Sequence, residues 1–245
     1  MRYKNYIFDL YGTLVDIHTE EDNQELWEKM RLFYGYYGAV YRSWEEMWKT
    51  YGALVEKYRE QGKTMRNDGH EACPEIQIQL VFADLFKEKG AQPSEELAVH
   101  AGQMFRALST EYIRLYPGVP KLLDRLTRQG GNLYLLSNAQ RIFTAYELAF
   151  LELEKYFKGI LISSDYSVMK PDPEFFRLLL QKYDLKPEES IMIGNDEICD
   201  IKGAQKVGMD TCYIHSNIST EYTGKGKATY TLMKTDMEKL FQTIS

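Results

Sequence analysis

The sequence contains no apolar run that approaches the roughly 20 residues of a membrane-spanning helix, and Asp9 interrupts the apolar stretch near its start. We therefore expect neither a membrane anchor nor a signal peptide. Basic residues form no cluster, and the net charge is -6 at pH 7, which argues against nucleic acid or an anionic membrane as a partner. A small anionic substrate remains compatible with that charge, because the field inside a site can differ from the overall charge.

Cysteine is scarce as well. Cys73, Cys199 and Cys212 show neither the Cys-x-x-Cys nor the Cys/His spacing of a metal site, and three is an odd number for a disulfide framework. They indicate reduced thiols in a cytoplasmic protein. The 245 residues suffice for one large α/β domain or for a core with a smaller domain, as either a monomer or a homodimer.

Short β-rich segments alternate with helical segments at both ends of the sequence. Besides the run that ends in Asp9, β-rich segments cover residues 132–138, 157–165, 190–196 and 210–216. Helical patterns cover residues 119–129, 141–151, 173–183 and 201–207. This alternation predicts an α/β fold with a doubly wound parallel sheet. Ligands of such sheets bind outside the carboxyl ends of the strands.

Residues 16–116 follow a different pattern. Apolar residues recur there at helical spacing, as in Trp27, Met30 and Tyr34, and no strand is expected. The predicted division is an α/β core of residues 1–15 and 117–245, with an inserted all-α cap domain of residues 16–116. Its hinges would lie near residues 15–17 and 115–118.

Four motifs follow one another along the sequence, each at an expected strand end or helix start. They are FDLYGTL (residues 8–14), LLSNA (135–139), MKPDPEFF (169–176) and IGNDEICDIKGA (193–204). Together they resemble the haloacid dehalogenase superfamily of hydrolases, in the branch with a helical cap inserted after the first motif. The resemblance covers the core, whereas residues 16–116 match only in position and helical character.

The resemblance implies that Asp9 is a nucleophile whose carboxylate attacks phosphorus or carbon and forms an intermediate that water hydrolyses. It further implies that Lys170 neutralises the charge on Asp9 and the substrate. The glycine turn after Asp9 lets the amides of Leu10 and Tyr11 face the substrate. Thr13 either holds the Asp9 carboxylate by a hydrogen bond or caps the turn.

Ser137 stands at a strand end just before a helix, where a hydroxyl and neighbouring amides suit an anion. A plain N-cap role for Ser137 or Asn138 is compatible with the same placement. By resemblance, Ser137 binds the phosphate or carboxylate of the substrate and Asn138 assists.

The resemblance to the phosphatase branch also implies a Mg²⁺ site. Asp9, Asp196 and the backbone carbonyl of Tyr11 would supply its protein ligands, since Mg²⁺ prefers oxygen donors. Asp200 would orient a metal-bound water or pair with Lys170.

The last motif departs from the family pattern. Many phosphatases have Gly-Asp at this place, whereas this sequence has Asn195 in that slot and an acid one residue later. Either Asp196 or Glu197 could therefore be the metal carboxylate, and Asp196 is favoured.

The first motif departs too. In the phosphatases the residue two after the nucleophile is usually an aspartate that protonates the leaving group, and Tyr11, with an ordinary pKa near ~10, is a poor substitute. A halide needs no proton, which fits the L-2-haloacid dehalogenases of the family. Those enzymes, however, carry Ser-Ser-Asn before the last aspartate and a tyrosine where this sequence has Phe176. They also use a cap arginine, for which Arg42 is a candidate by position alone.

We therefore predict a hydrolase that most resembles a Mg²⁺-dependent phosphatase of a small phosphorylated metabolite. Metal-independent dehalogenation is the alternative within the family. A non-catalytic binding or regulatory protein on the same fold is the alternative of another class.

Overall fold

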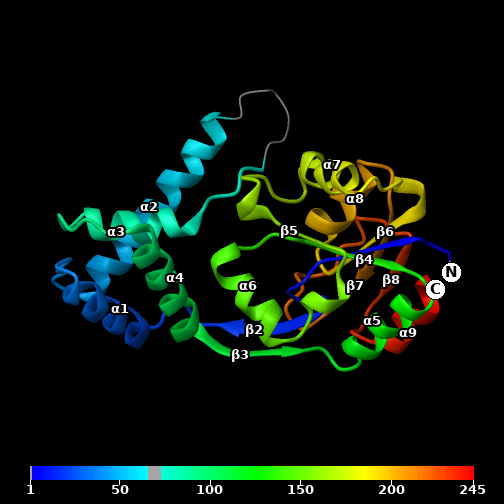
Figure 1. The fold of residues 1–245 in the computed structure, drawn as a ribbon, viewed down its shortest axis with the longest axis horizontal. Coiled ribbons are helices and arrows are strands. Elements are labelled where there is room, and N and C mark those ends of the chain that lie inside the picture. The colour runs from blue at the N-terminus through cyan, green and yellow to red at the C-terminus, as the bar shows by residue number, and fades with distance from the viewer. Residues whose placement is uncertain (1, 66–72) are drawn as a thin grey trace.

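The computed structural model describes residues 2–65 and 73–245 and contains a six-stranded, all-parallel sheet (Figure 1). The strand order is β5-β4-β1-β6-β7-β8. The strands are β1 (Asn5–Phe8), β4 (Asn132–Ser137), β5 (Gly159–Ile162), β6 (Ser190–Gly194), β7 (Asp210–Ile214) and β8 (Tyr230–Leu232). The doubly wound α/β fold predicted from the alternating pattern is confirmed.

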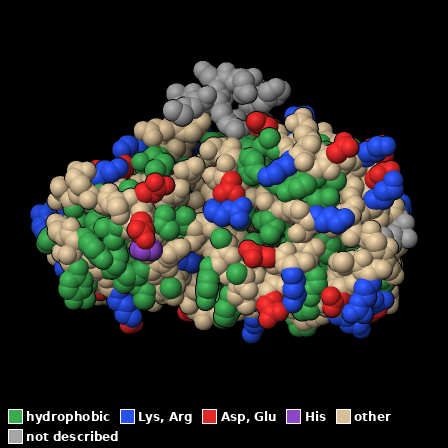
Figure 2. Space-filling view, viewed as in Figure 1, with side chains coloured by type: hydrophobic (Ala, Val, Ile, Leu, Met, Phe, Trp, Pro, Cys, Tyr) green, Lys and Arg blue, Asp and Glu red, His purple; other side chains and the backbone are tan. Residues whose placement is uncertain are grey.

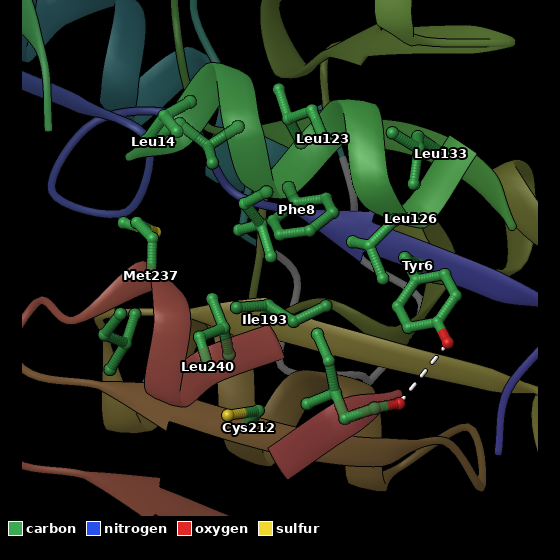
Figure 3. Close-up of a cluster of buried hydrophobic side chains, with 14 of the residues drawn as sticks. Tyr6, Phe8, Leu14, Leu123, Leu126, Leu133, Ile193, Cys212, Met237 and Leu240 are labelled. Atoms are coloured by element: carbon green, nitrogen blue, oxygen red, sulfur yellow. Dashed lines mark hydrogen bonds between the residues drawn. The ribbon is translucent and has the colours of Figure 1, made fainter. Parts of the chain in front are cut away.

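Alternation along the strands divides the core between the two faces of the sheet. Tyr6 and Phe8 point to one face and Ile7 to the other, as the period of two in a strand requires. The first face packs against α5 (Val119–Arg128) and α9 (Met237–Ile244), as Figure 3 shows. The second face packs against α7 (Pro173–Lys182) and α8 (Gly203–Gln205).

The predicted core elements agree with the structure to within a few residues, with two corrections. Helix α6 is Arg141–Phe150, but the segment predicted as helix 201–207 begins earlier, with a π-helical turn η4 (Glu197–Lys202) that leads into α8. The 157–165 segment is strand only in β5, and its end forms a 3₁₀ turn η2 (Ser163–Asp165). Strand β8 and helix α9 were absent from the sequence prediction, and two short 3₁₀ turns lie at Glu154–Tyr156 and Pro187–Glu189.

Four helices lie together at one end of the molecule (Figure 1). They are α1 (Gln24–Tyr36), α2 (Trp44–Met65), α3 (Ile78–Lys87) and α4 (Glu95–Ser109), and we refer to them as the four-helix group. Trp27, Met30, Tyr34, Phe82 and Phe105 are buried in its separate core. The helical spacing in the sequence therefore identified the residues that pack this group.

The expectation that residues 16–116 contain no strand is wrong. Strand β2 (Val15–Thr19) pairs antiparallel with β3 (Thr110–Leu115), so a two-stranded ribbon leads into and out of the four-helix group. Ile17 and Ile113 face each other in its register. The two strands pair across about a hundred residues, and each borders a helical segment of the sequence, which is why the pairing is not visible locally. The division of the chain into two domains remains a prediction.

The surface carries mixed charges. On the face shown in Figure 2, Lys and Arg side chains alternate with Asp and Glu, and hydrophobic side chains gather over the end formed by α1. Leu32 and Tyr36 of α1, and Val40 shortly after it, are among the exposed hydrophobic residues. Within residues 2–65 and 73–245, no helix combines the length and apolarity needed to cross a bilayer.

Candidate active site

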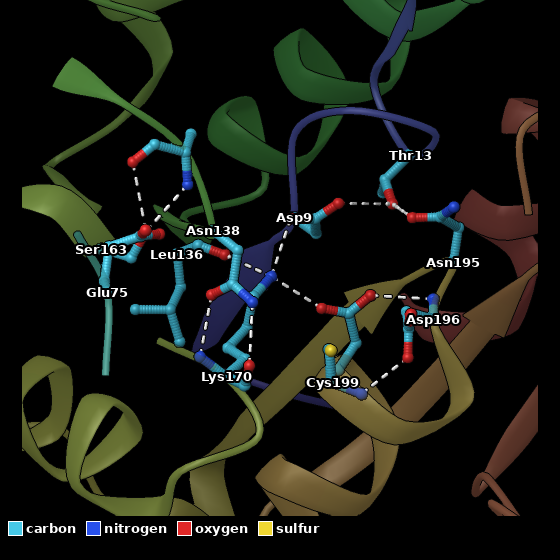
Figure 4. A network of polar contacts seen from close by, with 12 residues as sticks. Asp9, Thr13, Glu75, Leu136, Asn138, Ser163, Lys170, Asn195, Asp196 and Cys199 are labelled. Carbon is cyan, nitrogen blue, oxygen red and sulfur yellow. Dashed lines mark hydrogen bonds and ion pairs between the residues drawn. The ribbon is translucent and has the colours of Figure 1, made fainter. Parts of the chain in front are cut away.

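Asp9 follows the last residue of β1, in the middle of the sheet. Phe8 lies opposite Leu135 of β4 and Ile193 of β6, and the N–H of Asp9 donates to the Ile193 carbonyl at 2.9 Å. Because the three strands are parallel, the residues that follow them share the carboxyl edge of the sheet. The first, second and fourth motifs therefore meet around Asp9 (Figure 4).

Lys170 is the centre of a buried charge cluster. Its ammonium lies 2.7 Å from Asp9 Oδ1 and 2.7 Å from Asp200 Oδ1, and it donates to the Leu136 carbonyl at 2.9 Å. Burial lowers the pKa of Lys170, but the two carboxylates outweigh it and the pKa is raised. Burial raises the pKa of Asp200 to about 7, although Lys170 acts to lower it. Lys170 is thus a fixed cation beside Asp9, as the resemblance implied.

Asn138 holds the backbone of Lys170. Its Oδ1 accepts the Lys170 N–H at 2.8 Å, and its Nδ2 donates to the Lys170 carbonyl at 2.9 Å. Both ends of the amide are used in this pair of bonds, so the described contacts of Asn138 place Lys170. Its predicted help in binding substrate stays a prediction.

Ser137, the last residue of β4, is fully buried. Its Oγ has no hydrogen-bond partner within the described residues, which is costly for a buried hydroxyl. The carbonyl of the preceding residue, Leu136, accepts from the Lys170 ammonium, so the backbone just before Ser137 contacts the charge cluster. An anionic group of a substrate would satisfy this hydroxyl.

Replacing Ser137 by alanine tests this role. We expect Ser137→Ala to lower kcat/KM by about 10–100-fold, the value of one or two lost hydrogen bonds to a charged group. The unfolding free energy should stay the same or rise, because the replacement removes an unsatisfied polar atom. Steady-state kinetics and urea unfolding measure the two effects. Ser163→Ala is the matched control, because Ser163 Oγ already bonds Glu75 and the Ala139 N–H. A loss of stability in Ser137→Ala larger than in this control would contradict the assignment.

The loop after Asp9 turns sharply at Gly12, which has φ +82°, a conformation that favours glycine. Within this loop the Leu10 carbonyl accepts hydrogen bonds from the N–H groups of residues 13–15, and the Gly12 N–H donates to the Val15 carbonyl. The described hydrogen bonds of the loop do not use the N–H groups of Leu10 and Tyr11. Thr13 Oγ1 lies 3.4 Å from Asp9 Oδ2 and 3.4 Å from Asn195 Oδ1. Two roles were left open for Thr13, and the contact of its side chain with the Asp9 carboxylate agrees with the first of them.

The Tyr11 side chain is tied to α6. Its hydroxyl forms a short hydrogen bond with Glu147 and lies 3.0 Å from Thr144 Oγ1. Arg106 of α4 donates to Glu147 at 2.6 Å and stacks near the Tyr11 ring. Burial and the Glu147 charge raise the pKa of Tyr11 well above its ordinary value. The hydroxyl therefore cannot supply a base at neutral pH.

The Arg106–Glu147 ion pair joins α4 of the four-helix group to α6, with side chains only 17% and 10% exposed. We expect Arg106→Met to lower the unfolding free energy by about 3 kcal/mol, because it leaves a buried carboxylate without its cation. Arg141→Met is the matched control: the Arg141–Asp165 pair is exposed, so its loss should cost about 0–1 kcal/mol. Equal losses in the two variants, measured by urea unfolding, would refute the stabilising role of Arg106.

The fourth motif contains three adjacent polar residues, Asn195, Asp196 and Glu197, and their side chains point in different directions. Asp196 is the N-cap of η4, where its Oδ1 accepts the N–H groups of Ile198 at 2.8 Å and Cys199 at 2.6 Å. Its own N–H donates to Asp200 Oδ2 at 2.9 Å. The described contacts of the Asp196 side chain thus run to η4 rather than to Asp9.

Glu197 is turned away from the site. Its carboxylate accepts the N–H and hydroxyl of Thr223 at 2.6 and 2.9 Å, and the Gly226 N–H at 3.2 Å. Arg42, the candidate halide-binding arginine, is exposed on the four-helix group and pairs with Glu46. Phe176 is buried against the sheet. The structure therefore brings none of these three residues to Asp9.

The side-chain oxygen atoms at the strand ends are suitable ligands for a magnesium ion. Asp9 Oδ2 and Asn195 Oδ1 converge on one hydroxyl, that of Thr13, which has a single hydrogen for two acceptors. Acceptor oxygen atoms that outnumber the available hydrogen-bond donors can instead bind a hard cation such as Mg²⁺. Among the residues that the structure describes, no three His, Cys, Asp or Glu side chains gather as they would to hold a metal, so a Mg²⁺ site here would also need a backbone carbonyl or an amide oxygen.

The sequence matches the family model of the haloacid dehalogenase-like hydrolases over residues 3–208. The chain belongs to this family. It is therefore a hydrolase, and the family resemblance seen in the four motifs is confirmed.

Among individual relatives of this haloacid dehalogenase-like hydrolase, the glyceraldehyde 3-phosphate phosphatase of Pyrococcus furiosus is 34% identical over 115 residues, 45% of this chain. The chain spans about half the length of that relative, 48%. The crystal structure of Bacillus subtilis YfnB bound to magnesium has a TM-score of 0.56 at 22% identity, covering 100% of this chain and 99% of that one. A 2-haloacid dehalogenase from Pseudomonas syringae has a TM-score of 0.68 at 19% identity, covering 98% of both chains. The two structures show a common fold.

Proposed function

We propose that this hydrolase is a Mg²⁺-dependent phosphatase of a small phosphorylated metabolite, with Asp9 as its nucleophile. The observation that carries the proposal is the buried Ser137 hydroxyl, which has no partner among the described residues and follows directly after Leu136, whose carbonyl accepts from the Lys170 ammonium. A hydrogen-bond donor and a fixed cation beside a carboxylate suit a phosphoryl group. The phosphatase name of the Pyrococcus relative supports this choice, and the related YfnB structure is bound to magnesium.

The chemistry takes two steps. An Asp9 carboxylate oxygen attacks phosphorus, a new O–P bond forms, and the bond to the leaving oxygen breaks with its electron pair. Ser137, Lys170 and the N–H groups of Leu10 and Tyr11 would hold the equatorial oxygens. Water then attacks phosphorus, which releases inorganic phosphate and restores the Asp9 carboxylate.

Lys170 would hold the Asp9 carboxylate in position for the attack, and Asp200 would keep Lys170 in place. Bound Mg²⁺ would neutralise charge on the phosphoryl oxygens. Asp9 and the Tyr11 carbonyl would hold it, with a third oxygen from residues 195–196, where Asp196 is the residue predicted from the sequence.

The leaving group of the substrate is constrained by Tyr11. Its hydroxyl is engaged by Glu147 and Thr144 and its pKa is raised, so it does not replace the usual aspartate as proton donor. We therefore propose substrates whose leaving oxygen is already weakly basic, such as acyl, enol or aryl phosphates. Across a series of aryl and alkyl phosphates, log(kcat/KM) should fall steeply as the leaving-group pKa rises. A flat series would mean that another residue donates the proton.

The function is tested with purified protein, a panel of phosphate esters and 2-chloropropionate, each with Mg²⁺ and with EDTA. Phosphate release that requires Mg²⁺ supports the proposal. Chloride release in EDTA would replace it with dehalogenation, which the lack of a proton donor at Tyr11 favours as the second candidate. Substrate binding without turnover would indicate a non-catalytic binding protein. The cytoplasmic location and the monomeric or homodimeric state remain predictions from the sequence.

A further inference from the structure

Asn195 packs directly on the loop that follows Asp9. A Cβ atom at position 12 would lie 2.3 Å from Asn195 Nδ2 and 2.9 Å from its Oδ1, so the bare Cα of Gly12 is what admits this side chain. Asn195 is only 8% exposed. Its amide therefore borders the same loop whose Tyr11 carbonyl is a proposed metal ligand.

The amide oxygen of Asn195 faces the site. Asn195 Nδ2 donates to Ser219 Oγ at 3.2 Å, and Ser219 Oγ also accepts the Ser216 N–H at 3.0 Å. An amide whose nitrogen is held on one side must present its oxygen on the other. That oxygen lies 3.4 Å from Thr13 Oγ1, on the side of Asp9, as Figure 4 shows.

The oxygen is also weakly satisfied. Its described hydrogen bond is the long one from Thr13, and the same hydroxyl lies equally far from Asp9 Oδ2. One hydroxyl hydrogen cannot serve both acceptors at once. Asp9 Oδ2 and Asn195 Oδ1 therefore share one donor, and a cation could bind to both oxygens.

Asp196, by contrast, has another task. Its Oδ1 takes two backbone N–H groups and so caps η4, and the side chain is half-buried at the start of that turn. Moving this carboxylate toward Asp9 would leave both N–H groups without their partner, at a cost typical of a lost helix cap.

We propose that Asn195, and not Asp196, supplies the third protein oxygen for Mg²⁺. The proposal rests on the Mg²⁺-dependent function proposed above. A neutral amide contributes less to cation binding than a carboxylate, since ligand charge tunes the affinity of such sites. The protein should therefore bind Mg²⁺ more weakly than a variant with aspartate at position 195.

The test measures Mg²⁺ binding without substrate, by isothermal titration calorimetry and by the Mg²⁺-induced rise in melting temperature. We expect Asn195→Ala to weaken Mg²⁺ binding by about 10-fold or more, and Asn195→Asp to strengthen it by a similar factor. Asp196→Asn is the matched control, because asparagine caps a helix as well as aspartate does. It should change the Mg²⁺ dissociation constant by less than about 3-fold.

The outcomes separate this proposal from the function on which it rests. Loss of Mg²⁺ binding in Asp196→Asn, with binding retained in Asn195→Ala, would assign the ligand to Asp196 and overturn the proposal while leaving the function intact. Wild-type protein that binds no Mg²⁺ at millimolar concentration would overturn both. Melting curves recorded without Mg²⁺ show that each variant is folded, so a misfolded variant is not mistaken for a lost ligand.

Discussion

Asp9→Asn is expected to lower kcat for phosphate release by about 10⁴-fold or more, as the loss of an essential nucleophile does. A neutral amide oxygen attacks phosphorus poorly and forms no stable acyl phosphate. The fold should survive the change, because the introduced amide oxygen can still accept a hydrogen bond from Lys170 Nζ, which lies 2.7 Å from the present carboxylate. Stopped-assay kinetics with an aryl phosphate measure the effect.

Asp236→Asn provides the matched control. Asp236 caps α9 through the Lys239 N–H, outside the candidate site, and asparagine preserves that cap. Its kcat should stay within about 2-fold of the wild-type value, since surface changes of this kind alter little. Acid quenching during turnover, followed by mass spectrometry, should find phosphate on the Asp9 peptide of the wild type. An Asp9→Asn variant that keeps a tenth of the wild-type kcat would exclude Asp9 as nucleophile.

Lys170→Met should lower the unfolding free energy by about 3–5 kcal/mol, the usual cost of removing one partner from a buried ion pair. The methionine matches the length of the lysine chain, so the cavity is small. The cost arises because Asp200, 1% exposed, and Asp9, 8% exposed, lose the cation between them, and the Leu136 carbonyl loses its donor. Urea unfolding followed by circular dichroism measures the loss.

Removing the negative charge of Asp200, which Lys170→Met leaves unpaired, tests whether that charge causes the loss of stability. Lys170→Met combined with Asp200→Asn should recover at least half of the lost stability, while phosphate release stays abolished. Lys182→Met is the surface control and should change the unfolding free energy by less than about 0.5 kcal/mol. If the double variant is no more stable than Lys170→Met alone, the unpaired charge of Asp200 is not the source of the instability.

Features that depend on residues close in sequence were predictable. The alternation of β-rich and helical segments indicated the parallel sheet, because the period of the apolar residues reports which side of each element is buried. The parallel sheet in turn placed Asp9, Ser137 and the fourth motif at one edge. The apolar spacing of Trp27, Met30 and Tyr34 likewise marked the core of the four-helix group.

Features that depend on contacts between residues far apart in the sequence could not be predicted. The pairing of β2 with β3 and the contact of Tyr11 with Glu147 join residues roughly a hundred or more positions apart, and neither segment carries a local signal of its partner. Strands β2 and β3 also border the helical patterns of α1 and α4 in the sequence, and those patterns outweigh the periodicity of the strands.

The sequence by itself determined the family, the sheet and the Asp9–Lys170 pair, since motif order and apolar periodicity are local properties of the chain. Only the tertiary structure decided how the polar side chains at positions 195–197 are used. Asn195 faces the loop of the nucleophile, Asp196 caps η4, and Glu197 binds the distant segment around Thr223. The three adjacent side chains diverge because the backbone changes direction where β6 ends and η4 begins. Such directions follow from packing against Gly12, Ser219 and Thr223, which no local pattern records.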